Sequence, residues 1–177
     1  MVRHCLTNSE ICQQQVQDVS FFLVEFLGLE EKSGYSENDL ETHLIDNLQK
    51  FLLELGAGYT FVARKKRFTF NEDHFRVDLV FYNRCFVLFD LKIRILKHQD
   101  LGQMQMYVNY YTRELMNEGD NPPIGILLCA EKNDAVVKYS LPENNNQIYA
   151  SKYFTYLPTE EELKQELKLD DYKKIPD

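Results

Sequence analysis

The chain has no long hydrophobic stretch. Its longest apolar runs, such as Ile124 to Ala130, are far shorter than the roughly 20 residues that a membrane-spanning helix needs. The N-terminus lacks the basic stretch and following apolar stretch of a secretory signal. These two absences predict a cytoplasmic protein.

Cysteine and histidine are scarce and scattered. None of the four cysteines, at positions 5, 12, 85 and 129, forms a C-x-x-C pair, and the four histidines lie far apart. A zinc site needs clustered ligands, so none is expected. In a reducing compartment the cysteines are expected to be free thiols rather than disulfides. G-x-S-x-G and HExxH motifs are absent as well.

Positive charge is in deficit. Lys and Arg number 20 against 28 Asp and Glu, a net charge of -8, which by itself argues against nucleic-acid binding. The charges are nevertheless uneven, with a basic run at Arg64-Lys65-Lys66-Arg67 and a second basic stretch from Lys92 to His98. Such a run is either a phosphate-binding surface or an ordinary solvated face. On a strand, alternation would put only half of the run on one face.

The rest of the composition is that of one globular domain. The chain has 177 residues, of which 44% are hydrophobic and 27% charged, enough for one domain with a core and too few for two. We expect an N-terminal adapter segment at 1–35, one domain at 36–168 and an acidic tail at 169–177.

Helical and strand periodicities alternate along this domain. Helices are predicted from Asp39 to Leu55, with a capping box of Asn38 and Glu41, and from Asp100 to Glu118. The strands are expected at Tyr59–Phe70, Phe75–Tyr82, Cys85–Leu91, Ile124–Cys129 and Ile148–Leu157, with a last helix at Thr159–Leu167. The order α-β-β-β-α-β predicts an α/β fold with a mixed sheet flanked by helices.

Two acids stand in strands that are otherwise apolar, Asp78 and Asp90. A buried ionised carboxylate is costly unless it is paired or bound to a metal. Lys92 lies two residues after Asp90, so both side chains project from the same face of a strand. Two carboxylates and a lysine on one face suit a hard divalent cation beside a phosphate. The alternative is a buried ion pair of Lys92 with either acid.

The turn between the second and third strands decides whether the two acids meet. A two-residue loop, Asn83-Arg84, puts Asp78 and Asp90 on opposite faces of the sheet. A three-residue loop that includes Cys85 puts Asp78 opposite Asp90 on one face. An active site therefore requires an odd-length turn or a bulge, and without one the domain would be degenerate and inactive.

An Asp followed by Asp-x-Lys on adjacent strands, after a helix that bears Glu41, resembles the PD-(D/E)xK nuclease superfamily. The wider sequence is similar to its YhcG-like family over about residues 18 to 168. The stretches that carry this resemblance are Glu41, Phe51–Gly56, Val77–Tyr82, Asp90–Lys92, Gly102–Met104, Pro123–Cys129 and Leu157–Leu163. It implies a restriction-endonuclease-like core and a metal-dependent phosphodiesterase, a DNA endonuclease that cleaves with a metal-activated water. Asp90 stands where the superfamily more often has Glu.

The resemblance also implies a role for each matching residue. Asp78, Asp90, the Leu91 carbonyl and Glu41 would bind Mg²⁺ or Mn²⁺, Glu41 directly or through water. Lys92 would orient the attacking water or stabilise charge in the transition state, and Gln103 would position water or phosphate. Glu41 and Gln103 each also stand where a capping box, begun by Asn38 or Asp100, would place them.

DNA is the substrate that the resemblance implies, with RNA left open. The residues expected to contact nucleic acid are Arg64, Lys65, Lys66, Arg67, Arg94 and Lys97. Because the chain is acidic and its N-terminal segment short, a homodimer or a DNA-binding partner domain is expected to supply affinity. The alternative function is a catalytically inactive nuclease-fold domain that serves in DNA or protein interaction.

Overall fold

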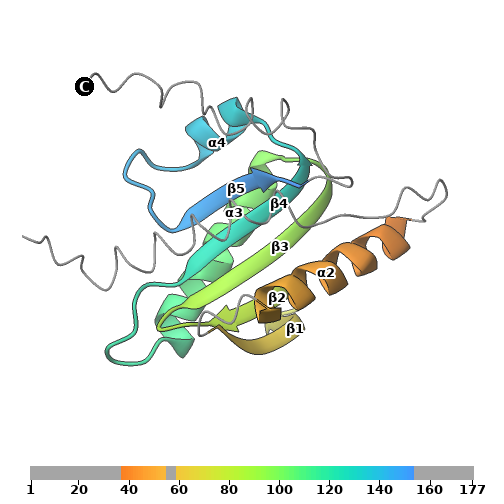
Figure 1. Cartoon of the computed structure of the whole chain (residues 1–177). Coiled ribbons are helices and arrows are strands. Elements are labelled where there is room, and N and C mark those ends of the chain that lie inside the picture. The colour runs from red at the N-terminus through yellow and green to blue at the C-terminus, as the bar shows by residue number, and fades with distance from the viewer. Residues whose placement is uncertain (1–36, 55–58, 154–177) are drawn as a thin grey trace, which may run out of the picture.

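The computed structural model describes residues 37–54 and 59–153 (Figure 1). The adapter segment, the acidic tail and the predicted helix at Thr159–Leu167 lie outside these residues. The described elements are, in order, α2 (Glu37–Glu54), β1 (Thr60–Phe70), β2 (Asp73–Tyr82), β3 (Phe86–Ile95), α3 (His98–Tyr110), a π-helical turn (Tyr111–Leu115), β4 (Ile124–Glu131), α4 (Asp134–Ser140) and β5 (Ile148–Lys152).

The strands form one mixed sheet in the order β1-β2-β3-β4-β5. The pairs β1/β2 and β2/β3 are antiparallel, whereas β3/β4 and β4/β5 are parallel. Parallel neighbours need a crossover connection, which α3 supplies between β3 and β4 and α4 between β4 and β5. The sequence did not predict α4, because its 7 residues are too short to display a helical period.

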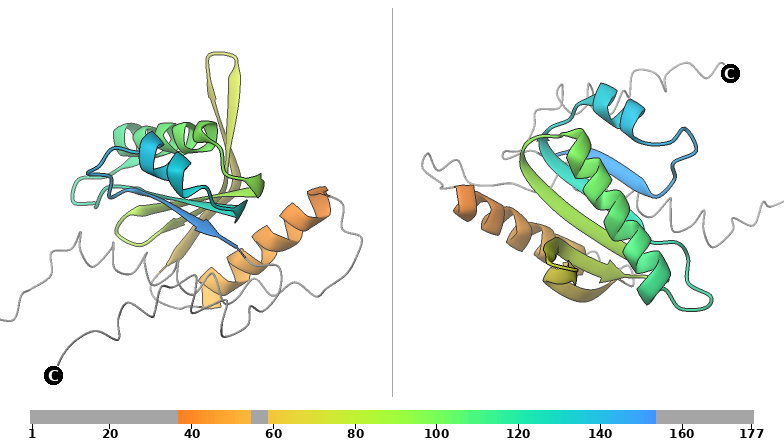
Figure 2. Two further views of the ribbon diagram at one scale, coloured as in Figure 1. Left: turned by 90° about the horizontal axis from the view of Figure 1, so that it is seen from above. Right: turned by 180° about the vertical axis from the view of Figure 1, so that it is seen from behind.

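One long helix lies on each face of the sheet (Figures 1 and 2), and a cluster of buried hydrophobic residues lies under each. On one face, α2 packs Leu44, Ile45 and Leu48 against strand residues such as Phe81 and Phe89. On the other face, α3 belongs to a second buried cluster with inward residues of β2, β3 and β4. The near-continuous apolar runs of β3 and β4 follow from this burial on both faces.

The β1–β2 hairpin extends past the helices, as the left view of Figure 2 shows. Its aromatic side chains attach it to α3. The ring of Phe68 stacks on that of Tyr110, with centroids 4.8 Å apart, and meets Tyr107 edge-on at 5.2 Å. The Tyr107 hydroxyl also donates a hydrogen bond to the main-chain carbonyl of Arg76, at 3.0 Å. These contacts fix the position of β2 relative to α3.

The cysteine prediction is correct at one described position and wrong at the other. Cys129 is a buried free thiol, whereas Cys85 is disulfide-bonded. Spacing along the chain does not reveal which cysteines approach closely enough to form a bond. No helix in the described residues is both long and apolar enough to cross a membrane.

Candidate active site

The loop between β2 and β3 has three residues. Tyr82 pairs with Phe86 and Leu79 with Phe89, which leaves Asn83, Arg84 and Cys85 outside the ladder. Arg84 adopts the left-handed conformation, with a φ of 55°, as one residue of a three-residue hairpin loop commonly does. The odd-length turn that an active site requires is therefore present, although the sequence had suggested that the strand begins at Cys85. Its register carries Asp78 and Asp90 to the same face of the sheet.

Asp78 lies where the paired register of β2 and β3 ends. Its Oδ2 accepts a hydrogen bond from the main-chain N–H of Leu91, at 2.8 Å. The carboxylate of Asp78 thus accepts the Leu91 N–H beyond the last paired residues of β2 and β3, and this bond holds β3 beside β2. This contact fixes the carboxylate on the backbone of the Asp90-Leu91-Lys92 segment.

Both carboxyl groups are buried, with relative exposures of 4% for Asp78 and 3% for Asp90. Burial is the main cause that raises the pKa of each, and it raises the pKa of Asp90 from 3.8 to about 7. Each group also feels a neighbouring acid: Glu41 raises the pKa of Asp78, and Asp78 raises that of Asp90. The ionised pair is therefore unfavourable without a positive partner.

Lys92 supplies one such partner. Its Nζ lies 2.7 Å from Asp90 Oδ2 and 3.4 Å from Gln103 Oε1. The Lys92 ammonium is the close partner of Asp90 Oδ2, and no other described residue donates a hydrogen bond to this oxygen. The Asp90–Lys92 ion pair that the sequence left open is thus present.

Gln103 contacts this ion pair from helix α3, whose N-terminus is capped by Lys97 and Asp100 and not by Gln103. Helix α3 begins at His98, and buried Asp100 accepts the N–H of Lys97 at 2.8 Å. Arg94 donates both Nη groups to the same carboxylate, each at 2.8 Å. The capping box at Lys97 and Asp100 therefore excludes the alternative capping role of Gln103. The capping box of Asn38 and Glu41 is wrong as well, because α2 begins at Glu37.

Glu41 is held at the edge of the site by two cations. Its Oε1 lies 3.5 Å from Lys65 Nζ and 3.4 Å from Arg76 Nη2. The Nε of Arg76 is in turn 4.0 Å from Asp78 Oδ1. Sequence reasoning missed Arg76, although its place two residues before Asp78 gave a signal, since alternate residues of a strand share a face.

One cavity of about 320 Å³ collects these groups. It brings together all five predicted catalytic residues and Leu91, and adds two that were not predicted, His74 and Arg76. Its lining is Glu41, His74, Arg76, Asp78, Asp90, Leu91, Lys92 and Gln103. Within the described ranges, no three His, Cys, Asp or Glu side chains are grouped so as to hold a metal ion. A cation here would rely on the two aspartates and main-chain oxygen.

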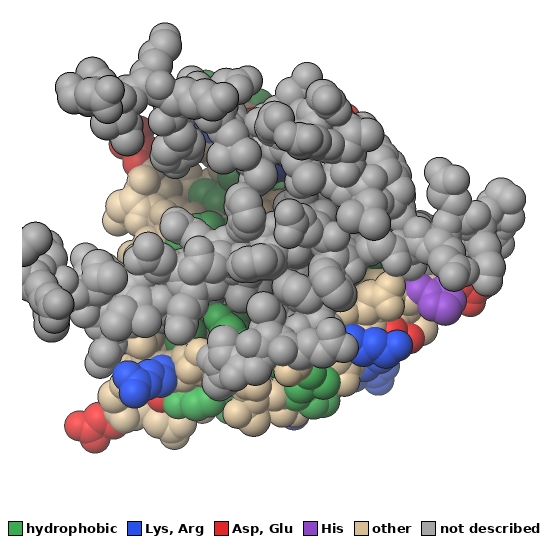
Figure 3. All heavy atoms as spheres, in the orientation of Figure 1, with side chains coloured by type: hydrophobic (Ala, Val, Ile, Leu, Met, Phe, Trp, Pro, Cys, Tyr) green, Lys and Arg blue, Asp and Glu red, His purple; other side chains and the backbone are tan. Residues whose placement is uncertain are grey.

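The basic run of β1 does not alternate as a regular strand would. Arg64 pairs with Asp46 of α2, and its neighbour Lys65 reaches Glu41 on the same helix. Lys65 has a φ of 49°, which breaks the alternation, so the expected division into alternate members is wrong. Lys66, Arg67 and Lys97 are exposed. Where described residues form the lower margin in Figure 3, basic side chains are interspersed with acidic and hydrophobic ones.

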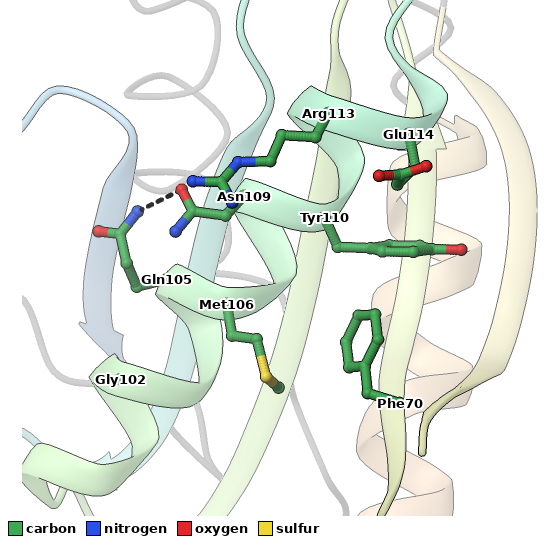
Figure 4. A pocket seen from close by; sticks show the side chains of 8 residues that line it. All are labelled: Phe70, Gly102, Gln105, Met106, Asn109, Tyr110, Arg113 and Glu114. Atoms are coloured by element: carbon green, nitrogen blue, oxygen red, sulfur yellow. Dashed lines mark hydrogen bonds between the residues drawn. The ribbon is translucent and has the colours of Figure 1, made fainter.

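A second cavity, of about 380 Å³, lies along α3, and no buried carboxylate lines it. Figure 4 shows the rings of Phe70 and Tyr110 on one side of it and the hydrogen-bonded pair Gln105–Asn109 on the other. Its charged lining residues are Arg113 and Glu114, which are exposed. The buried carboxylates of Asp78 and Asp90 line only the first of these two cavities.

The chain is similar in sequence to known nucleases. The profile of a family described as YhcG PDDEXK nuclease domain matches residues 13–168. The protein named "Putative nuclease YhcG" of Escherichia coli (strain K12) is 42% identical over 158 residues, which cover 88% of this chain and 41% of that protein. The chain thus spans less than half the length of this relative.

Two solved structures are also similar. A repair endonuclease from Pyrococcus abyssi has a TM-score of 0.46 at 19% identity, over 73% of this chain and 50% of that one. EndoMS in a dsDNA complex has a TM-score of 0.47 at 17% identity, over 73% and 48%. The described elements themselves follow the predicted order α-β-β-β-α-β, with a mixed sheet between helices. With the family profile matched over most of its length, this chain belongs to the YhcG PDDEXK nuclease domain family.

Proposed function

We propose that this domain hydrolyses phosphodiester bonds of DNA and requires a divalent cation, Mg²⁺ or Mn²⁺. One observation carries the proposal. Two buried carboxylates, Asp78 and Asp90, lie on one face of the sheet and line a cavity together with Lys92. Membership of a nuclease family supports the hydrolytic activity.

The residues of the cavity fit a hard cation. Asp90 Oδ2 is a buried anionic oxygen whose close partner among the described residues is the Lys92 ammonium alone. The burial that raises the pKa of both acids favours any further ligand that stabilises their ionised forms. Asp78, Asp90 and the Leu91 carbonyl would hold the cation, as all three are oxygen donors. Glu41 would reach it through water. When bound, a cation at this position supplies a water of lowered pKa and neutralises phosphate charge.

Lys92 and Gln103 would serve the reacting phosphate. The Lys92 ammonium, held by Asp90 and Gln103, is already placed to stabilise charge that develops on the phosphate oxygens. The Gln103 amide uses its Oε1 for Lys92, and its NH₂ group can donate to a phosphate oxygen or orient the attacking water. The Arg94–Asp100 pair keeps the first turn of α3, and with it Gln103, in place.

Substrate affinity would come from exposed cations and from outside this domain. Lys66, Arg67 and Lys97 are exposed and available to phosphates, while Arg64, Lys65 and Arg94 already have acidic partners. Because the whole chain has a net charge of -8, the nuclease domain at 36–168 would depend on a second copy or on a DNA-binding domain.

An inactive interaction domain was the alternative, and the turn after β2 was its main support. The three-residue loop removes that support, because its register puts both aspartates on one face. The Asp90–Lys92 ion pair does not favour the alternative either, since the same two groups serve a hydrolytic site.

A cleavage assay with matched variants tests the proposal. Linear, circular and branched DNA, and RNA of the same sequence, would be incubated with the protein in Mg²⁺, Mn²⁺ or EDTA, with melting temperatures measured in parallel. We expect cation-dependent cleavage of DNA, and a melting temperature that rises with cation because the folded state alone binds it. Asp78→Asn should lose both effects.

Asp73→Asn is the control, because Asp73 is an exposed acid at the start of the same strand; it should keep both. Wild-type protein that cleaves no substrate, and whose melting temperature ignores both cations at about millimolar concentration, would overturn the proposal.

A further inference from the structure

Arg76 bridges two carboxylates at the entrance of the cavity. Its guanidinium lies 3.4 Å from Glu41 Oε1 through Nη2 and 4.0 Å from Asp78 Oδ1 through Nε. These acids come from different elements, α2 and β2. Arg76 therefore lies between the two predicted metal ligands Glu41 and Asp78.

The backbone of Arg76 is fixed, while its side chain remains accessible. Buried Tyr107 of α3 donates to the Arg76 carbonyl at 3.0 Å, and the side chain is 48% exposed. Neither acid contact is a short bidentate pair, in contrast to the Arg94–Asp100 pair, in which both distances are 2.8 Å. Long, half-exposed contacts of this kind contribute little to stability, so the guanidinium can exchange one anionic partner for another.

A cation in the site would compete directly with this arginine. Both are positive, and both interact with the carboxylate of Asp78. Once a cation neutralises Asp78, the guanidinium loses attraction for it and is repelled by the new charge. A guanidinium presents five N–H donors in a planar fork that matches the oxygens of a phosphate. The group released at the cavity entrance is thus one suited to a nucleic-acid backbone.

We infer that Arg76 neutralises Asp78 and Glu41 in the cation-free site and binds a phosphate of the DNA backbone once a cation has taken its place. The inference rests on the proposed function and adds to it a phosphate-binding residue. It also couples the two ligands: the cation frees Arg76 for DNA, and DNA draws Arg76 away from the cation site. Such a coupling must be reciprocal, with each ligand raising the affinity for the other.

Arg67 offers a matched control. It lies directly across the hairpin from Arg76 in the β1/β2 register and is exposed, yet it is not among the described residues that line the cavity. A phosphate contact from Arg67 would therefore be independent of the cation.

The experiment uses Ca²⁺, a hard cation that takes oxygen ligands, with a gel to verify that the DNA stays intact. Calorimetry would give the Ca²⁺ affinity of DNA-free protein, and fluorescence anisotropy the affinity for a short duplex with and without Ca²⁺. We expect Arg76→Gln to bind Ca²⁺ several-fold more tightly, because a competing charge is gone. With saturating Ca²⁺ it should bind duplex about tenfold more weakly, with a salt slope reduced by about one.

The Arg67→Gln control distinguishes a phosphate contact that depends on the bound cation from one that does not. Arg67→Gln should leave the Ca²⁺ affinity unchanged and weaken duplex binding equally with and without Ca²⁺. Arg76→Lys keeps the charge but not the fork, so it should bind Ca²⁺ like the wild type and duplex several-fold more weakly in Ca²⁺. It serves as the test variant if Arg76→Gln does not fold.

Three results would overturn the inference alone, provided that the wild type binds Ca²⁺. These are an unchanged or weaker Ca²⁺ affinity in Arg76→Gln, wild-type duplex binding by Arg76→Gln in Ca²⁺, and wild-type duplex binding by Arg76→Lys in Ca²⁺. Wild-type protein that binds neither Ca²⁺ nor Mg²⁺ would instead overturn the proposed function, and this inference with it.

Discussion

Lys92 Nζ lies 2.7 Å from Asp90 Oδ2, and the two residues are separated by only one position on β3. The pair forms within one strand and needs no other element to bring it together. Even with this lysine beside it, the pKa of Asp90 is raised to about 7, because the effect of burial exceeds that of the ion pair. The cation-free site therefore contains a carboxyl group that readily takes up a proton near neutral pH.

This raised pKa predicts how the stability of the cation-free protein depends on pH. Above about pH 7, Asp90 is ionised in both the folded and the unfolded state, and the folded state carries the full cost of burial. As the pH falls from there toward the ordinary value of 3.8, the folded state takes up a proton and the unfolded state does not. The free energy of unfolding should then rise, by up to about 1.4 kcal/mol per pH unit for one proton.

The measurement compares wild type with Asp90→Asn by denaturant unfolding in EDTA between about pH 8 and pH 5. The wild type should gain stability relative to Asp90→Asn as the pH falls, and saturating Mg²⁺ should reduce this gain because a cation favours the ionised form. Asp73→Asn, a change at an exposed acid, should follow the wild type. A stability difference between wild type and Asp90→Asn that stays constant with pH would contradict the prediction.

The basic run of β1 should divide into two functional halves. Arg64 and Lys65 pair with acids of α2, whereas Lys66 and Arg67 are exposed. We expect a Lys66→Ala/Arg67→Ala variant to bind every DNA sequence more weakly, with a salt dependence flatter by about one unit per contact. The Arg64→Ala/Lys65→Ala variant should retain most of its DNA affinity and unfold slightly more easily, since each exposed ion pair contributes at most about 1 kcal/mol.

Titrations at several salt concentrations, together with thermal melts, would distinguish the two halves. Wild-type affinity in the Lys66→Ala/Arg67→Ala variant would mean that this part of the run is a solvated face. If the Arg64→Ala/Lys65→Ala variant lost more DNA affinity than the Lys66→Ala/Arg67→Ala variant, Arg64 and Lys65 would be shown to bind DNA despite their ion pairs with α2.

The centre of the site was predictable because it depends on local rules. Asp78, Asp90 and Lys92 stood out as charged residues in apolar strands, and strand alternation relates their faces. The register between the two strands reduced to whether the loop had an odd or even number of residues. The sequence posed this question, and the conformation of Arg84 settles it.

The surroundings of the site were not predictable in the same way. The contacts of Arg76 and Lys65 with Glu41 join residues of different elements, and no local period records which of them meet. The left-handed conformation of Lys65 is unusual for a lysine and had no signal in the residue type. Asp100 looked like the start of a capping box, but its burial and its pairing with Arg94 make it the third residue of one. Each of these misses involves tertiary contacts that outweigh a local preference.

Lys92 is where structural and catalytic roles can be separated. Replacing it with Met removes the partner of a buried carboxylate, and breaking a buried ion pair typically costs about 3–5 kcal/mol. Here the loss should be smaller, because Asp90 already has a raised pKa and can take up a proton instead of remaining an unpaired anion. We expect Lys92→Met to fold and to bind Mg²⁺ at least as well as the wild type, since a like charge has been removed. Cleavage of DNA should fall by several powers of ten because the transition state loses a positioned positive charge.

Melting temperature, Mg²⁺ calorimetry and cleavage rate of Lys92→Met would be measured on one preparation. The control is Lys50→Met, a change at an exposed position on α2. A variant that does not fold would assign Lys92 to the architecture, and a folded variant that cleaves at the wild-type rate would remove it from the mechanism.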